Sequence, residues 1–135
     1  MSKVDIQPLA NAIARLEEAL AVYRRDPSQT LIRDGLIQRF EFTYEIAHRT
    51  LKRYLVEVSP APAQYDAMPF QDLIRTANTQ GLLLGDWPKW RVYRDMRART
   101  SHTYDETTAL EVVEGIEPFV AEARHLREQL ASRLK

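Results

Sequence analysis

Hydrophobic residues recur at spacings of three and four along most of the chain, the period that gathers them on one face of an α-helix. The first stripe predicts a helix that ends at Asp26-Pro27-Ser28, because proline cannot continue the helical hydrogen bonds. A longer and wider stripe predicts a second helix from about Leu31 to Val58, buried on more than one side. The first stripe consists of Ile6, Leu9, Ile13, Leu16, Leu20 and Tyr23.

Prolines and glycines divide the middle of the chain. The Ser59-Pro60-Ala61-Pro62-Ala63 stretch predicts an extended connector, because proline also disfavours helix at the residue before it. Pro69 to Thr79 follows as a short predicted helix, and Gly81 is placed to stop it. The Leu82-Leu83-Leu84 run is too short to be an element of its own, and we expect it to fill the core as a loop.

Two further helices are predicted in the second half of the chain. Asp86 is placed to cap the first of them. The second begins near Thr103, which together with Glu106 has the spacing of a capping box. Gly115 and Pro118 interrupt its apolar stripe, so we expect a kink there and not a straight helix.

No segment shows the alternation typical of a β-strand, and there is no internal repeat. The predicted fold class is therefore all-α: an up-and-down four-helix bundle with an additional short helix. At this length we expect residues 1–135 to form a single helical-bundle domain.

Composition narrows the function classes. The chain has no cysteine, which excludes disulfides, thiol catalysis and iron–sulfur clusters and makes a reducing cytoplasm the expected compartment. No apolar run is long enough to cross a bilayer and no signal region opens the chain, so we expect no membrane association.

Several chemical motifs are absent from the sequence. The four glycines form no phosphate-binding loop or dinucleotide fingerprint, so we expect no nucleotide cofactor. His48, His102 and His125 are far apart and make no metal-binding motif, so we expect no metal. The chain does not look like a stand-alone metal-dependent nucleotide enzyme.

The net charge of zero conceals a polarised chain. Lys89, Arg91, Arg94, Arg97 and Arg99 place five cations within eleven residues, opposed only by Asp95. From Thr103 to Glu122 there are six acids and no Lys or Arg. Neutrality argues against a protein that coats nucleic acid by bulk attraction, yet it permits a local phosphate site where the two stretches meet.

Arg97 and His102 lie on either side of that junction. On an unbroken helix they would diverge by about 140°, but a turn between Arg99 and Thr103 would let them converge at the start of the last helix, where backbone N–H groups favour phosphate. Arginine stabilises charge on a phosphodiester, and histidine exchanges protons near neutral pH. The pair could cleave RNA by using the ribose 2′-OH as the nucleophile.

Simpler interpretations compete with this one. Arginines on an amphipathic helix usually form a solvated face, and a histidine at a helix start is usually a cap or a surface residue. A tyrosine close by, here Tyr104, usually serves packing.

Two segments carry a family resemblance. One contains the Ile37-Gln38-Arg39-Phe40-Glu41 run, and the other is Ser101-His102-Thr103-Tyr104-Asp105-Glu106. Together with helix order and length, they resemble the nucleotidyltransferase substrate-binding protein family, a branch of the HEPN superfamily. The resemblance implies a four-helix bundle, a homodimer or higher assembly, and a small separate nucleotidyltransferase as partner.

The resemblance also implies roles for individual residues. The HEPN signature is an arginine, four to six residues, and a histidine, which Arg97 and His102 match; Tyr104 completes the longer signature of toxin–antitoxin pairs. In that branch the HEPN protein resembles a metal-independent endoribonuclease, and the partner silences it by transferring AMP to the tyrosine. Arg97 would then hold the phosphate, His102 would move the proton and Tyr104 would be modified. Candidate substrate-binding residues beside them are Arg94, Arg99 and Ser101.

Two features of the second predicted helix call for separate interpretation. Relatives often have Trp at the position of His48, and we interpret His48 as a packing residue. Glu41, Glu45 and Arg49 follow one another at four-residue spacing. We interpret them as ion pairs along one helix face, the alternative being a dimer seam or the polar rim of a cleft.

Three functions therefore compete: a HEPN ribonuclease toxin, a non-catalytic subunit that presents a substrate or nucleotide to its nucleotidyltransferase, and a structural adaptor. The set of Arg97, His102 and Tyr104 favours the first over the third but does not separate the first from the second.

Overall fold

A computed structural model describes residues 4–134, and these residues contain helices and no strand. The prediction of an all-α chain is confirmed. The elements in order are α1 (Gln7–Arg25), α2 (Thr30–Val58), the 3-10 turn η1 (Pro62–Tyr65), α3 (Phe70–Thr79), α4 (Trp87–Arg99), the 3-10 turn η2 (Thr100–His102), α5 (Glu106–Glu114) and α6 (Ile116–Arg133).

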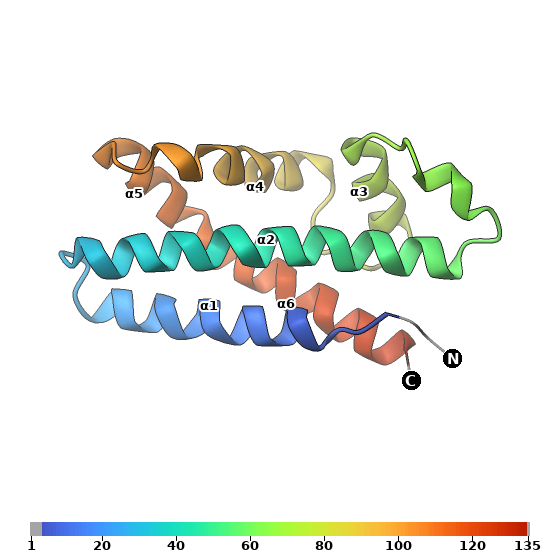
Figure 1. The fold of residues 1–135 in the computed structure, drawn as a ribbon, viewed down its shortest axis with the longest axis horizontal. Helices are drawn as coiled ribbons and strands as arrows, with labels where there is room; N and C mark the ends of the chain where they lie inside the picture. The colour runs from blue at the N-terminus through green and yellow to red at the C-terminus, as the bar shows by residue number, and fades with distance from the viewer. Residues whose placement is uncertain (1–3, 135) are drawn as a thin grey trace.

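The helices form an up-and-down bundle with an extra short helix, as predicted (Figure 1). α1 and α2 lie antiparallel side by side, and α4 returns along the other side of α2. α5 and α6 then run back along the bundle, with α6 crossing α2 at an angle, while α3 is the additional short helix. The end of α4 and the start of α5 therefore meet at one end of the molecule.

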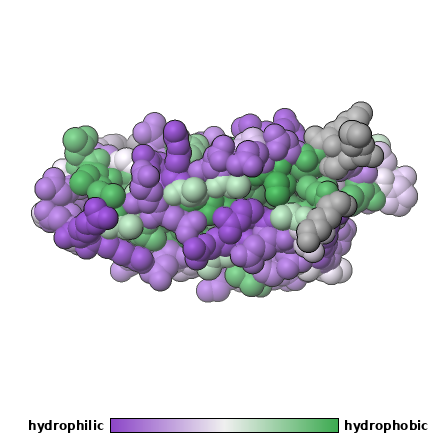
Figure 2. All heavy atoms as spheres, turned by 90° about the horizontal axis from the view of Figure 1, so that it is seen from below, coloured by the Kyte–Doolittle hydropathy of each residue, from purple (hydrophilic) through white to green (hydrophobic). Residues whose placement is uncertain are grey.

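The buried apolar residues form one continuous cluster to which α1, α2, α3, α4, α5 and α6 all contribute. Its centre is aromatic: the Phe40 and Phe119 rings meet edge to face at 5.0 Å, and Trp90 and Tyr93 do so at 5.5 Å. The face that carries α1 is mostly hydrophilic, with narrow bands of hydrophobic residues between the polar ones (Figure 2). Core packing thus fixes how α2, α4 and α6 face one another.

The start of the last helical segment differs from its prediction. Thr103 and Glu106 do not form a capping box; the cap is Asp105, whose carboxylate accepts a hydrogen bond from the Thr108 backbone N–H at 3.1 Å. The Thr103 hydroxyl instead donates a hydrogen bond to the Thr100 carbonyl. The Glu106 carboxylate accepts hydrogen bonds from both terminal nitrogens of buried Arg33, at 2.8 and 3.0 Å. The Asp86 cap of α4 is confirmed.

The predicted kink is a break between α5 and α6 at Gly115. A side chain there would collide with Met96 of α4, because an added Cβ would lie 2.3 Å from the Met96 sulfur. Gly115 therefore permits close contact of α4 with the α5–α6 joint. Gly81 ends α3 with a φ of +77°, the left-handed conformation that glycine adopts readily.

The leucine run after α3 fills the core only in part: Leu82 and Leu83 are buried, whereas Leu84 is 59% exposed. The backbone here is held by Glu122 of α6, which is only 2% exposed. Its carboxylate accepts the N–H groups of Leu84 and Gly85, both at 2.7 Å, and the Trp90 indole N–H at 3.1 Å. Three donors thus satisfy a buried charge and tie the start of α4 to α6.

Candidate active site at the junction of α4 and α5

Arg97 lies in the last turn of α4 and points toward α2. Its Nε and one terminal nitrogen donate to Glu45, and its other terminal nitrogen lies 3.3 Å from the Thr100 hydroxyl and 3.7 Å from a Glu41 oxygen. The hydrogen bond to Glu45 raises the pKa of Arg97 above its ordinary value. The guanidinium is therefore a fixed cation on a partly exposed surface.

The two glutamates of α2 do not have the partners we expected. Glu41 and Glu45 reach across to α4, and Glu45 pairs with Arg97 and not with Arg49 of its own helix. Glu41 also accepts the Thr100 hydroxyl at 2.6 Å. The interpretation as ion pairs along one helix face is thus wrong, because the carboxylates face a neighbouring helix that carries a closer cation.

Thr100 is a site residue that the sequence patterns did not select. It is buried, and its hydroxyl lies within hydrogen-bond distance of both the Glu41 carboxylate and the Arg97 carbonyl in the last turn of α4. The available signal was indirect: Glu41 and Glu45 are one helical turn apart, so both could serve a single partner on a facing helix.

His102 and Tyr104 lie on the outside of the junction, and both are exposed, Tyr104 to 87%. Their rings lie close to perpendicular, with centroids 6.1 Å apart. The chain does turn after Arg99, through η2, as the convergence argument required. No hydrogen bond or ion pair among residues 4–134 joins Arg97 to His102 within the single chain.

A phosphate at the N-terminus of the last helix, as the spacing suggested, does not fit the structure. The Asp105 carboxylate already occupies the N-terminus of α5, and Glu106 in its first turn is paired with Arg33. The hydrogen bonds from Thr108 lower the pKa of Asp105, so it is ionised at neutral pH. The charge of Asp105 therefore disfavours a phosphate at the N-terminus of α5.

The structure separates the three candidate substrate-binding residues. Arg99 pairs with Glu111 of α5. Arg94 lies over the Phe70 ring, with 5.6 Å from its guanidinium carbon to the ring centre, on the side of α4 that faces α3. Ser101 is exposed in η2 beside His102. Ser101 thus adjoins the proposed centre, whereas Arg94 lies farther along α4.

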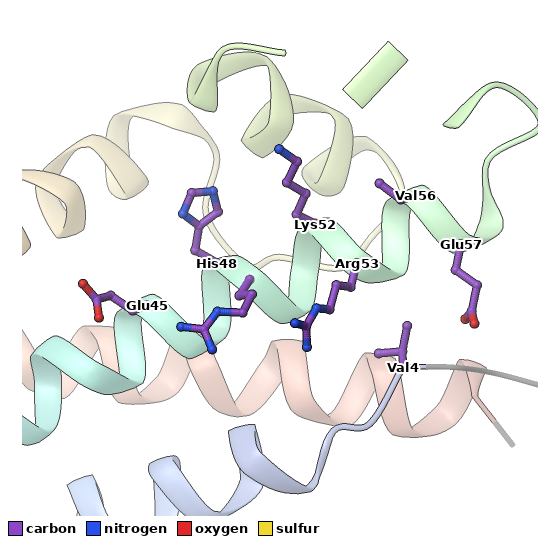
Figure 3. Close-up of a pocket in the computed structure, with 8 residues that line it drawn as sticks. Val4, Glu45, His48, Lys52, Arg53, Val56 and Glu57 are labelled. Atoms are coloured by element: carbon purple, nitrogen blue, oxygen red, sulfur yellow. The ribbon is translucent and has the colours of Figure 1, made fainter. Parts of the chain in front are cut away.

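An open groove of about 1140 Å³ lies over the second half of α2, and its lining includes Glu45, His48, Arg49, Lys52 and Arg53. We call it the α2 groove (Figure 3). His48 packs edge-on against Phe70 with ring centres 4.6 Å apart, which supports its interpretation as a packing residue, although it also lines the groove. Burial lowers the pKa of His48, and the nearby charges of Lys52 and Arg94 lower it further.

Residues 4–134 contain no group of three or more His, Cys, Asp or Glu side chains placed to hold a metal ion. The same residues include no helix that is both long and apolar enough to span a bilayer.

Known proteins resemble this chain along most of its length. A protein of Haemophilus influenzae named probable ribonuclease HepT is 43% identical over 99 residues, which are 73% of this chain and 67% of the relative. A solved Haemophilus influenzae structure, described as the fold of a substrate-binding domain of a nucleotidyltransferase, superposes with a TM-score of 0.87 at 35% identity. That match covers 94% of this chain and 99% of the other.

The family model of nucleotidyltransferase substrate-binding protein-like chains matches residues 4–132, almost the whole length of the bundle. Sequence, fold and family model agree, and the chain belongs to this family.

Proposed function

We propose that this protein is a HEPN-type endoribonuclease toxin, silenced when a partner nucleotidyltransferase transfers AMP to Tyr104. The main support is the 43% identity to the probable ribonuclease HepT. The junction of α4 and α5 adds to it, since there a fixed arginine lies close in sequence to an exposed histidine and an exposed tyrosine. The rest of the proposal follows from the chemistry of these three side chains.

Arg97 has capacity left for a phosphate. A guanidinium has five N–H donors, and the hydrogen bonds to Glu45 and Thr100 use three of them. The remaining two can bind phosphate oxygens and stabilise the charge that grows on them during cleavage. Glu41 and Glu45 hold the guanidinium in place, so that little ordering is needed when RNA arrives.

His102 would move the protons. Its neutral imidazole takes the proton from the ribose 2′-OH, whose oxygen attacks the adjacent phosphorus, and the bond to the 5′-oxygen breaks. The leaving oxygen takes a proton, which an imidazolium can supply, and the products carry a 2′,3′-cyclic phosphate and a 5′-OH. In a homodimer that brings two junctions together, one His102 can act as the base and the other as the acid.

Tyr104 is accessible enough to be a modification target. Its phenolic oxygen would attack the α-phosphorus of ATP, lose its proton and release pyrophosphate, leaving AMP on the ring. The new anion would lie beside His102, with which the Tyr104 ring is already in contact range, and would repel an incoming RNA phosphate.

A non-catalytic substrate- or nucleotide-binding subunit is the second candidate. The family description and the description of the solved relative both favour it. In either case we propose a single-domain, cytoplasmic protein that works as a homodimer or a larger assembly with a small nucleotidyltransferase. Sedimentation equilibrium of the purified chain tests the assembly, with a mass of at least two chains as the expected result.

Intact-mass spectrometry tests the silencing step. The chain is incubated with ATP, Mg²⁺ and the proposed partner nucleotidyltransferase. We expect the mass to rise by one or more AMP units in the unmodified chain and not in Tyr104→Phe, and RNA cleavage to fall with the extent of modification. An adduct that persists in Tyr104→Phe would rule out Tyr104 as the target, and cleavage that continues after full modification would rule out silencing.

A further inference from the structure

Three cations that form no ion pair within the described part of the chain give the α2 groove its positive charge. Arg49, Lys52 and Arg53 are all exposed, and no ion pair joins any of them to a carboxylate of residues 4–134. Elsewhere on the described surface, cations such as Arg24, Arg39 and Arg124 are paired with glutamates. Three adjacent cations without such partners are a binding surface for an anion.

The groove continues directly into the Arg97 site. Glu45 lines its near end, and the same carboxylate holds Arg97. Because Glu45 is neutralised by that pairing, it does not cancel the charge of the groove, and with Glu57 also in the lining the three cations still exceed the acids. From Glu45 to Arg53 the α2 axis extends about 12 Å, so a bound chain can contact the groove and Arg97 at once.

The side chains spread over the open surface of α2. His48 and Lys52 rise on the side that faces α3, and Arg53 extends on the other side (Figure 3). Arg94 adds charge close to His48, since its guanidinium lies over the Phe70 ring against which His48 packs. Cations on both sides of a shallow channel suit a flexible backbone that carries a charge at every repeat.

We propose that the α2 groove binds the phosphate backbone of single-stranded RNA and leads it to Arg97 and His102. This inference rests on the ribonuclease function proposed above. RNA fits better than a protein partner because most of the lining side chains are charged, with Val4 and Val56 as the aliphatic ones, and the core of a protein interface is depleted in charged residues. Positively charged grooves that follow a backbone are the usual design for single strands.

The test is equilibrium RNA binding followed by salt titration. A fluorescent single-stranded 20-nucleotide RNA is titrated with His102→Ala, which keeps the substrate intact, and with the same chain carrying Lys52→Gln and Arg53→Gln. The double change should weaken binding roughly tenfold or more at 0.1 M salt and lower the slope of log affinity against log salt by about 1.4. Arg15→Gln with Arg25→Gln removes equal charge from α1, outside the groove, and should change neither quantity.

Other outcomes separate this inference from the function on which it rests. An unchanged slope in the groove variant, or an equal loss in the α1 control, would overturn the groove as an RNA site. Loss of nucleotidyltransferase capture with RNA affinity intact would also overturn it, because the groove would then bind a protein. Groove-dependent RNA binding by a wild-type chain that cleaves no RNA would support the groove while refuting the ribonuclease.

Discussion

At the scale of single residues, the local setting of each charge decides what it can do. Arg97 is held by two carboxylates yet partly exposed, so it is ordered and still able to bind. Glu122 is a carboxylate sealed in the core. Glu122 does not stand out in the sequence, where it counts only as one of six acids in the acidic stretch. Sequence spacing selected Arg97, but it could not show which acids are solvated and which are structural.

Glu122→Gln should destabilise the fold by about 2–4 kcal/mol, because the amide keeps one acceptor oxygen and turns an N–H₂ toward buried donors. Urea unfolding measures the change. Glu128→Gln is the matched control on α6, where the side chain is exposed and should matter by less than about 0.5 kcal/mol. Equal stability of Glu122→Gln and Glu128→Gln would show that the fold does not depend on the Glu122 carboxylate as the acceptor for Leu84, Gly85 and Trp90.

The Arg33–Glu106 ion pair predicts that the folded state loses stability as pH falls. The hydrogen bonds from Arg33 lower the pKa of Glu106 in the folded state. A lowered folded-state pKa means that the contribution to stability is complete above the unfolded-state pKa and is lost as pH falls through the folded-state value. The free energy of unfolding should thus fall more steeply below about pH 4.5 in the wild type than in Glu106→Gln.

Urea midpoints from pH 7 to pH 3 measure this difference. Glu114→Gln, on an exposed position of the same helix, should keep the wild-type profile. If the urea midpoints of wild type and Glu106→Gln fall equally as the pH is lowered, the pair does not couple α5 to α2.

At the scale of elements, sequence patterns predicted helix bounds and caps correctly wherever a residue type has a single local effect. Proline and the apolar period predicted the bounds of α1 and α2 to within one residue or so, and Asp86 was recognised as a cap. The start of α5 was missed because Thr103, Asp105 and Glu106 are all competent caps or first-turn residues. Tertiary contacts decided among them, since Arg33 of α2 draws Glu106 away.

The glycines of α2 and of the α5–α6 joint should respond in opposite ways to alanine. Gly35→Ala meets nothing within 4 Å and should stabilise the protein by about 0.5–1 kcal/mol through helix propensity. Gly115→Ala should destabilise it by about 1 kcal/mol or more, because the new methyl group displaces the buried Met96 side chain.

Thermal or urea unfolding of the two variants gives the comparison. In a Met96→Ala background the Gly115→Ala penalty should disappear, since the colliding atoms are gone. A penalty that persists there would locate the effect in the backbone and not in the contact with α4.

At the scale of the whole molecule, the net charge of zero is the sum of positively and negatively charged regions that lie apart from one another. The basic residues of α4 do not act as one patch, because Arg97 and Arg99 pair with glutamates of other helices. Three further cations, Arg49, Lys52 and Arg53 of α2, form no ion pair with a carboxylate of residues 4–134, although the chain up to Ala67 is neutral overall, with nine cations and nine acids. The sequence shows that they fall within five residues, but only the folded arrangement shows that they line a groove that adjoins Arg97.

RNA cleavage in excess chelator, by wild type, His102→Ala and His125→Ala, tests whether His102 carries a metal-independent ribonuclease activity. His125 is the matched control, since it lies on α6 beside the Gly81 carbonyl and away from the junction. We expect the wild type and His125→Ala to cleave alike and leave 2′,3′-cyclic phosphate ends, and His102→Ala to be slower by about 10²–10⁴-fold. A wild type that leaves RNA intact, or a His102→Ala variant that cleaves at the wild-type rate, would contradict the account.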